Sequence, residues 1–256
     1  MIDYENRSYV TVIDIKDKNK VQKLLDIIPQ DVETIIDVGC GNGYITNELG
    51  KYYRVLGVDI NESKLKFVET EKLKSSCNQI DKPDHSFDLV FSSEMLEHLE
   101  DDLYESTLAE FNRLSKKYIL ITTPYREPLH KLTVQCESCG KNYNKNGHLR
   151  RFSRTSLLNL HPNWKVVKSE AFGKKVRNYR KALADLKHQL TPPSAWIPNY
   201  WIKNQGVKYN YCIHCGHKNR LEYKFNLLAF LIDILNMITT RKRKSHLLGL
   251  FEKRNP

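Results

Sequence analysis

The chain has 256 residues, of which 40% are hydrophobic, enough for one large domain or for one domain with insertions. A formal net charge of +11 and a sequence pI near 9.2 favour phosphates, nucleic acid or an anionic membrane surface as partners. A solvated basic face is the alternative. The polar start and the lack of about 20 consecutive apolar residues predict neither a signal peptide nor a transmembrane segment, so we expect a cytoplasmic protein.

The first predicted elements lead into a glycine-rich turn. Apolar residues at helical spacing predict a helix over residues 18–28, which Pro29 ends, so residues 1–30 form an N-terminal helical segment. The apolar run 34–38 predicts a buried strand, and a helical pattern begins after three alternating glycines, Gly39, Gly41 and Gly43. Because glycine has no side chain and tolerates positive φ, this turn lets the backbone pass close to a ligand.

Strands and helices then alternate along the chain. Asn61 is a predicted N-cap, and the predicted elements are strands at 54–60, 75–80, 87–92 and 117–124 and helices at 62–73 and 101–114. Such alternation predicts parallel βαβ units, whose ligands lie at the carboxyl ends of the strands. Four segments at those ends are therefore expected to share one cleft: residues 37–43, Asp59, residues 92–94 and residues 123–125.

The regular alternation ends after Tyr125. A basic, polar segment precedes a predicted helix at 156–160 and a predicted strand at 164–171, and residues 174–222 read as irregular because prolines and glycines interrupt them. The remaining predicted elements are an amphipathic helix at 225–238, the basic run 241–244 and a strand at 246–252. Burial of that helix on the sheet is favoured over peripheral contact with a membrane.

Two ligand classes compete for the glycine stretch. A dinucleotide-binding turn needs G-x-G-x-x-G, but Tyr44 stands at its third glycine position. The spacing from Asp37 is instead D-x-G-x-G-x-G, which resembles motif I of the class I S-adenosylmethionine-dependent methyltransferases. Later segments resemble further motifs of that family in the expected order, namely Val58-Asp59-Ile60, residues 83–90 and residues 93–99. The resemblance covers residues 30–125, and a nucleotide-binding dehydrogenase is the alternative.

The resemblance implies an α/β fold with a doubly wound, mostly parallel, seven-stranded Rossmann-like sheet whose last two strands form a hairpin. It divides the chain into core segments and insertions. The core consists of an S-adenosylmethionine-binding part at 31–125, a helix and strand at 156–173 and a final strand at 246–256. A first cysteine-knuckle insertion lies at 126–155, and a second insertion, with a cysteine knuckle and the amphipathic helix, lies at 174–245.

The resemblance also implies contacts to the cofactor's amino acid and ribose. Asp37 would orient the ammonium group of S-adenosylmethionine, and the three glycines would lie against its amino acid and ribose portions. Cys40, within the glycine turn, is expected to be a small space-filler there. Asp59 suits the ribose hydroxyls, since a carboxylate can accept two hydrogen bonds.

The adenine and methionine ends have their own candidates. Ile60 would pack on the adenine, and Ser76 and Cys77 stand where the family often has an acidic residue that reads the adenine amine. Ser93 or Glu94 would border the methionine end. Three nearby residues are interpreted as structural: Asp88 as a brace of its strand, and Glu97 and His98 as helix-packing residues.

Two C-x-x-C-G sequences place four cysteines in the insertions: Cys136, Cys139, Cys212 and Cys215. Each sequence puts two thiolates on a tight turn, and four sulfurs make a closed tetrahedral zinc site. In a cytoplasmic chain such thiols are more often metal ligands than disulfides. Positions 140–211 separate the two pairs by 72 residues, so we expect a structural zinc that joins two insertions rather than one compact ribbon. A dithiol redox pair is the alternative.

Methyl transfer requires alignment of the acceptor and, for a hydroxyl group, removal of its proton. Tyr125, His130 and His148 are candidate bases, because they are near the strand ends in sequence or on the insertion that can cover the cleft. His148 begins an H-L-R-x-F segment, which resembles one in family members acting on small molecules, sugars and surface polysaccharides. A structural cap or a surface position is the alternative for each of the three.

Three function classes follow. The favoured one is a methyltransferase for a small-molecule or glycan acceptor, acting on oxygen; an RNA methyltransferase and a non-catalytic protein with a zinc interaction module are the alternatives. The basic insertions suit an anionic small molecule, a nucleotide-linked sugar or a glycan as acceptor. They also carry aromatic side chains that can stack on sugars or bases, namely Trp196, Tyr200, Trp201, Tyr209 and Tyr211. Ser92-Ser93-Glu94 replaces an Asn-Pro-Pro-Tyr-type motif, which argues against base N-methylation.

Overall fold

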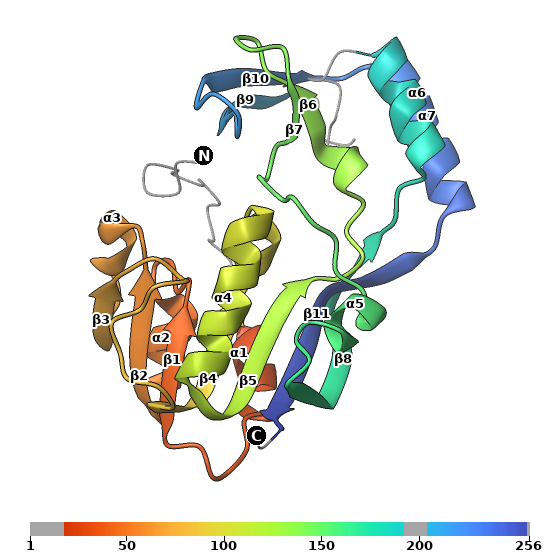
Figure 1. Ribbon diagram of the computed structural model, residues 1–256. Coiled ribbons are helices and arrows are strands. Elements are labelled where there is room, and N and C mark those ends of the chain that lie inside the picture. The colour runs from red at the N-terminus through yellow and green to blue at the C-terminus, as the bar shows by residue number, and fades with distance from the viewer. Residues whose placement is uncertain (1–17, 192–203, 255–256) are drawn as a thin grey trace.

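A seven-stranded sheet forms the centre of the molecule (Figure 1). The computed structural model describes residues 18–191 and 204–254. The strand order is β3-β2-β1-β4-β5-β11-β8, in which the first five strands are parallel and β11 runs antiparallel to both of its neighbours. The strands are β1 Thr34–Val38, β2 Arg54–Asp59, β3 Glu71–Lys74, β4 Phe87–Ser93, β5 Ser115–Pro124, β8 Trp164–Arg177 and β11 Lys242–Lys253. The predicted mostly parallel Rossmann-like sheet with a terminal hairpin is confirmed.

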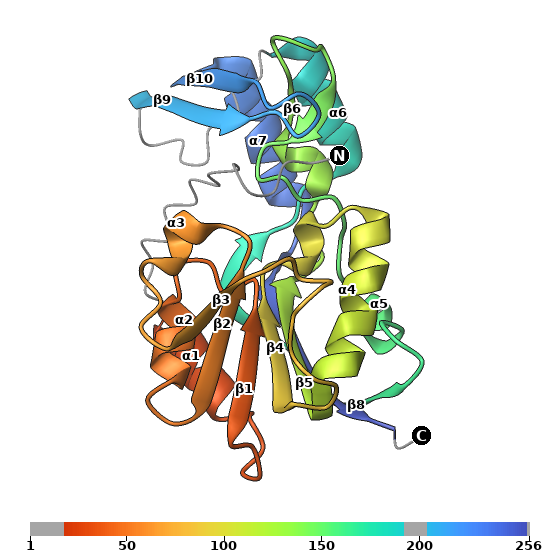
Figure 2. The same ribbon diagram turned by 60° about the vertical axis from the view of Figure 1, so that its left-hand side comes forward.

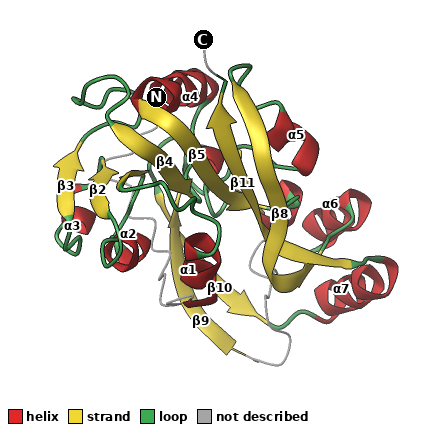
Figure 3. Cartoon of the chain, turned by 90° about the horizontal axis from the view of Figure 1, so that it is seen from below, coloured by secondary structure: helices red, strands yellow, loops and turns green. Residues whose placement is uncertain are grey.

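Helices cover both faces of this sheet, with α4 and α5 on one side and α1 and α2 on the other (Figure 3). Successive strand residues point to opposite faces: Ile36 joins the apolar cluster under α4, whereas Ile35 joins the cluster under α1. Both faces are therefore apolar, as a doubly covered parallel sheet requires. The core helices are α1 Lys18–Leu25, α2 Tyr44–Leu49, α3 Glu62–Leu65, the 3-10 turn η1 Leu96–His98, α4 Asp101–Leu114 and α5 Arg154–Leu158.

The structure corrects the region after the second strand. The helix predicted over 62–73 ends at Leu65, although Asn61 caps it as predicted, with its side chain accepting from the Lys64 amide. The third strand is β3 rather than residues 75–80, which form a loop. Within the described part of the chain, β3 pairs only with β2 at the edge of the sheet. It is largely exposed, so its sequence lacks the apolar pattern of a buried strand.

A smaller lobe stands over the carboxyl ends of the parallel strands (Figure 2). We use the word lobe for seven elements: the 3-10 turn η2 Leu129–Leu132, β6 Thr133–Gln135, β7 Asn142–Asn144, α6 Lys181–Leu190, β9 Asn204–Tyr211, β10 Lys218–Lys224 and α7 Leu227–Thr239. β6 pairs with β7, and β9 with β10, in two antiparallel hairpins. Residues 174–222 are thus more regular than the sequence suggested, since they include the end of β8, a helix and a hairpin.

Helix α7 packs against α6 in the lobe, so its expected position on the sheet is wrong. Its inward face carries polar side chains, of which Asp233 and Asn236 are buried. Its outward face is apolar and exposed, with Leu227, Leu231 and Ile238 more than half accessible. Among the described residues, no helix has the length and apolar character that crossing a bilayer would need.

Candidate active site

One large cavity lies between the carboxyl edge of the sheet and the lobe. Its volume is about 680 Å³, and it takes side chains from the ends of β1, β2 and β4, from the loop at 145–148 and from β9 of the lobe. All but one of the predicted cofactor residues line it, namely Asp37, Gly39, Cys40, Gly41, Asp59, Ile60, Ser76, Cys77, Ser93 and Glu94. Gly43 lies outside the cavity and is the N-cap residue of α2.

The three glycines of the turn are required for different reasons, although each has a positive φ. A Cβ on Gly39 would lie 2.5 Å from a Met95 carbon, and one on Gly43 would lie 2.7 Å from Val68. At Gly41, by contrast, no described atom lies within 4 Å of the added Cβ. Gly39 and Gly43 therefore serve internal packing, whereas Gly41 opens its backbone toward the cavity, where a ligand would occupy the space of a side chain.

Asp37 is a buried carboxylate with one unsatisfied oxygen. Its Oδ2 accepts from Thr46 Oγ1 at 2.7 Å, whereas its Oδ1 has no hydrogen-bond partner among the described residues. Burial raises the pKa of Asp37 to about 7, the Thr46 hydrogen bond opposes this shift, and the charge of Asp59 adds to it. An ammonium group of a ligand would satisfy Oδ1 and stabilise the ionised form.

Asp59 links the glycine turn to the end of β2. Its Oδ2 accepts from the Gly41 amide at 2.8 Å and its Oδ1 from the Asn61 amide at 2.8 Å. Each carboxylate oxygen has a second lone pair, so the group can accept from two hydroxyls as well. Nearby, Cys77 Sγ lies 3.1 Å from Thr107 Oγ1, and Ser76 Oγ donates to Asn78 Oδ1, so both candidate adenine contacts belong to the cavity wall.

Comparisons with known proteins identify the domain that carries this cavity. Residues 36–118 match the family model of a methyltransferase domain. These residues form a class I, S-adenosylmethionine-dependent methyltransferase domain. A small-subunit ribosomal RNA methyltransferase A of Campylobacter hominis is 32% identical over 77 residues, which are 30% of this chain and 26% of that protein. The chain therefore matches about a quarter of the length of this relative.

Solved structures show the same fold as the methyltransferase domain and its flanking elements. An S-adenosylmethionine-dependent methyltransferase from Archaeoglobus fulgidus aligns with a TM-score of 0.55 at 17% identity, over 92% of each chain. Another from Methanosarcina mazei aligns with a TM-score of 0.52 at 14% identity, over 91% of this chain and 98% of the other. At such identities the likeness concerns the fold alone.

The methyltransferase domain has a dense polar network at the end of β4. Glu94 accepts from Lys20 Nζ at 3.2 Å, from Thr122 Oγ1 at 3.2 Å and from His246 Nδ1 at 3.1 Å. Burial disfavours ionisation of Glu94, but Lys20 and His246 lower its pKa below the usual value. Glu94 therefore connects α1, β5 and β11 beneath the cavity. Sequence reasoning missed Lys20, which is only 8% exposed although it lies on a short, mainly polar helix.

Glu97 lies next to this network but has no such partners. It is fully buried, lines the cavity, and neither of its carboxylate oxygens has a hydrogen-bond partner among the described residues. Burial, together with the charge of Glu94, raises its pKa well above the usual value. The interpretation of Glu97 as an ordinary packing residue therefore does not account for its position.

The structure places the three candidate bases differently. His148 lines the cavity, and its Nδ1 donates to Glu127 Oε2. His130 lies outside this cavity, and its Nε2 faces the carbonyl oxygen of Tyr179 at 2.9 Å. Tyr125 also lies outside it and forms a bridge to Phe152. Only His148 of the three therefore lines the cavity, because the loop after β7 returns to the end of β4, where the Leu149 amide donates to Glu97 O at 2.7 Å.

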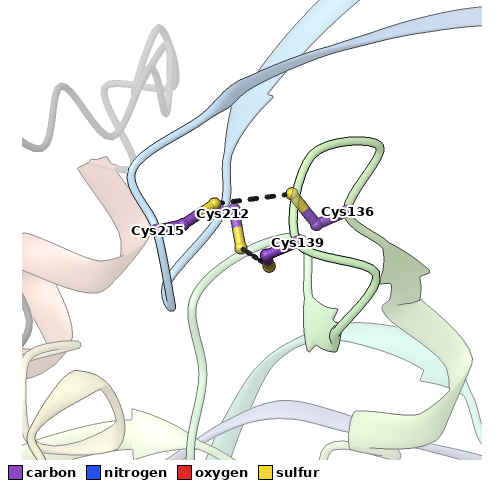
Figure 4. A group of neighbouring side chains, drawn as sticks. All are labelled: Cys136, Cys139, Cys212 and Cys215. Atoms are coloured by element: carbon purple, nitrogen blue, oxygen red, sulfur yellow. Dashed lines mark hydrogen bonds between the residues drawn. The ribbon is translucent and has the colours of Figure 1, made fainter.

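The four lobe cysteines converge on one point, as Figure 4 shows. Their sulfurs all lie within 4.8 Å of one another, with Cys136 and Cys215 at 3.6 Å and Cys139 and Cys212 at 3.7 Å. Four thiolates around a tetrahedral zinc, each at about 2.3 Å, would be about 3.8 Å apart. The donor set therefore fits zinc, and all four cysteines are free thiols rather than disulfides in this structure.

The two cysteine turns have the same backbone geometry. The Gly140 amide donates to Cys136 O at 3.0 Å, and the Gly216 amide donates to Cys212 O at 2.9 Å. Both glycines have a positive φ, about 70°, which explains the glycine after each C-x-x-C. Asn219 of β10 donates to Cys136 Sγ at 3.8 Å, so a side chain outside the turns also orients a sulfur.

Proposed function

We propose that this chain is an S-adenosylmethionine-dependent methyltransferase that methylates an oxygen atom of a small-molecule or glycan acceptor. One observation carries the proposal: a single cavity joins the residues suited to the cofactor, Asp37, Gly41 and Asp59, to a polar cluster of the buried Glu97 and the half-buried His98 and His148. The first group suits a cationic amino acid and a ribose, and the second suits the activation of a hydroxyl group.

Each cofactor residue has a definite role in this proposal. S-adenosylmethionine, when bound, supplies a methyl group on a positively charged sulfur. Asp37 Oδ1, which lacks a partner among the described residues, would accept from the ammonium group, and the Asp59 carboxylate would accept from the ribose hydroxyls. Gly41 would allow the backbone to lie against the ligand, since a side chain there would enter the cavity.

The lobe side of the cavity suits an anionic acceptor. Tyr209 and Tyr211 of β9 line it, and Lys145, from the loop after β7, and Lys174, from β8, belong to the same lining. The acidic lining residues lie on the sheet side, as do Lys20 and Lys64. Trp196, Tyr200 and Trp201, which the sequence suggested as further stacking residues, lie outside the described residues. Lysines and aromatic rings on one wall favour a sugar or small molecule with a phosphate or carboxylate group. A zinc ion on the four cysteines would hold this wall in place.

The proposal is tested first at the cofactor. We expect Asp59→Ala to weaken S-adenosylhomocysteine binding about 10- to 100-fold in calorimetry, since a partly buried acceptor of two hydroxyls is lost. The matched control is Asp102→Ala at the exposed start of α4, which should bind as the wild type does. No binding by the wild type would overturn the proposal and leave the non-catalytic class. Methyl transfer to a panel of anionic glycans and small molecules then tests the acceptor.

RNA is the second candidate acceptor. The ribosomal RNA methyltransferase relative and the net charge of +11 favour it. Binding to tRNA or rRNA that weakens steeply with salt, together with methyl incorporation into that RNA, would establish this alternative. Methylation of the glycan panel without RNA methylation would exclude it.

Peripheral membrane contact is proposed for α7. Its exposed face includes Leu227, Leu231 and Ile238, and the basic residues 241–244 follow it directly. An apolar face beside positive charge suits an anionic lipid surface and would bring the cavity to a lipid-linked acceptor. Sedimentation with anionic vesicles, but not with neutral ones, is the expected result, and Leu231→Ser should reduce it.

A further inference from the structure

A second group of residues that could bind a metal consists of Glu97, His98 and His148. Its donor atoms are oxygen and nitrogen, whereas those of the cysteine group are sulfur. Each offers one donor atom, and the three donor atoms lie within 4.8 Å of one another. Glu97 and His98 belong to η1, at the end of β4, whereas His148 belongs to the loop after β7. All three line the main cavity, so an ion bound there would be open to a ligand.

The carboxyl group of Glu97 is the strongest evidence that this group of residues binds a cation. It is 0% exposed, and both of its oxygens lack a hydrogen-bond partner within the described chain. The neighbouring Glu94, by contrast, receives hydrogen bonds from Lys20, Thr122 and His246. Burial without a hydrogen-bond partner is unfavourable for the carboxyl group, and a cation bound there would stabilise its ionised form.

Both imidazoles are held through the same ring nitrogen. His98 Nδ1 lies 3.3 Å from the carbonyl oxygen of Gly147, and His148 Nδ1 contacts the carboxylate of Glu127. Metal-binding histidines usually donate one ring N–H to a carbonyl or a carboxylate and bind the ion through the other nitrogen. The two histidines match this arrangement, and an ion would be bound through Nε2 of each.

The backbone fixes the two segments to each other. The Leu149 amide donates to Glu97 O at 2.7 Å, beside the contact between His98 and Gly147. The rings of His98 and His148 meet edge to face, with their centroids 4.6 Å apart. Ligands from residues about fifty positions apart are thus held together before any ion is present, which lowers the cost of binding.

We propose that Glu97, His98 and His148 bind one divalent first-row transition-metal ion, with Glu127 as a positioning residue for His148. Two imidazoles and one carboxylate suit such ions, whereas Mg²⁺ and Ca²⁺ prefer oxygen ligands throughout. Three protein ligands leave coordination positions open on the cavity side, unlike the closed set of four cysteines.

This proposal rests on the proposed function and gives the site its role. The acceptor hydroxyl would bind the ion through its oxygen and lose its proton to solvent. The resulting oxygen anion forms the new O–C bond with the methyl carbon, while the carbon–sulfur bond breaks and its electron pair stays on sulfur. The charge on sulfur is thereby neutralised, and no oxidant or reductant is needed.

Cobalt binding tests the site directly, without any need for activity. We expect the full chain, purified with its lobe zinc, to bind one Co²⁺ ion in calorimetry and to show a visible spectrum without the intense thiolate bands of cysteine ligation. Glu97→Gln keeps the side-chain shape and should weaken Co²⁺ binding at least about 100-fold. Glu127→Gln should weaken it about 10-fold. His130→Gln, a histidine change outside the cavity, is the matched control and should bind as the wild type does.

The outcomes separate this inference from the proposed function. Absence of Co²⁺ binding by the wild type, or equal binding by wild type and Glu97→Gln, would overturn the cation site. If that protein still binds S-adenosylhomocysteine, the proposed function stands. Thermal unfolding of each variant shows whether it is folded, and weaker Co²⁺ binding by a folded Glu127→Gln supports the site even if Glu97→Gln is unstable.

Discussion

The methyltransferase core and the lobe are stabilised in different ways. The core has two apolar clusters of 19 and 14 buried residues, one on each face of the sheet. Among the described residues, the cluster in the lobe has six buried members, and two of them are the ligand-type cysteines Cys136 and Cys212. So small an apolar cluster rarely supports a folded unit without a metal or a cross-link.

Polar groups replace the missing apolar contacts inside the lobe. Lys187 of α6 pairs with Asp233 of α7, and Tyr179 donates to the same carboxylate at 2.5 Å. Asn219 contacts both Tyr143 and Cys136, and thereby joins the cysteine turns to the lobe interior. The core thus depends on many interchangeable contacts, whereas the lobe depends on a few specific ones. Single changes in the lobe should therefore have the larger effects.

Metal removal is expected to have the largest effect. A strong chelator, or Cys212→Ser, should remove zinc and unfold the lobe, because a structural zinc contributes roughly 10 kcal/mol to such small units. Hydrogen exchange should show loss of protection in β6, β7, β9 and β10 but retained protection in β1 and β4. Cys77→Ser, outside the lobe, is the control. The result that would contradict zinc stabilisation of the lobe is unchanged protection of its amides from hydrogen exchange after chelation, together with no zinc by elemental analysis of the untreated protein.

The next effect is expected at the buried ion pair. Asp233→Ala leaves Lys187, which is 1% exposed, without its carboxylate, and should destabilise the lobe by about 3–5 kcal/mol in urea unfolding. Replacing both partners, as Lys187→Met with Asp233→Leu, should cost much less. Asp185→Ala removes an exposed pair with Lys181 on the same helix and should leave the unfolding midpoint almost unchanged. Equal effects of Asp233→Ala and Asp185→Ala would refute a lobe held by buried polar contacts.

A smaller effect, dependent on pH, is expected in the core at Asp37. Its folded pKa of about 7 lies above the unfolded value of about 3.9, so its contribution to stability is present below about pH 4 and is lost as the pH rises through 7. Asp37→Asn cannot ionise and should be more stable than the unliganded wild type above pH 7, by on the order of 2 kcal/mol. It should also bind S-adenosylhomocysteine less well. Melting temperatures across pH 4 to 8 measure the difference.

Asp88 provides the matched control, because its shift has the opposite sign. Burial disfavours its ionisation, but hydrogen bonds from Thr34 and from the Glu33 amide lower its pKa to about 2. Its contribution to stability is therefore present above about pH 4 and is lost as the pH falls toward 2. Asp88→Asn should lose stability at neutral pH, by about 1 kcal/mol. If stability at neutral pH changed in the same direction in Asp37→Asn and Asp88→Asn, burial of Asp37 would not control the pH dependence of stability.

The difference between the core and the lobe also explains which secondary-structure elements were predictable from the sequence. In the core, apolar runs and glycine spacing are local signals, so β1, β4, β5 and α4 were located almost to the residue. β3 was misplaced because an exposed edge strand carries no apolar pattern. The lobe elements β9, β10 and α6 were missed because their stability comes from contacts across the lobe rather than from local periodicity.

The sequence by itself determined the two motifs that each lie within a few residues: the aspartate and glycines of the cofactor turn, and the paired C-x-x-C-G turns. Backbone conformation and ligand chemistry at such sites depend on neighbouring residues, so their spacing is informative. Only the tertiary structure placed Lys20 beside Glu94, left Glu97 without a partner, and turned His148 rather than His130 toward the cavity. These positions depend on chain segments about fifty or more residues apart, whose meeting follows from the packing of the whole fold.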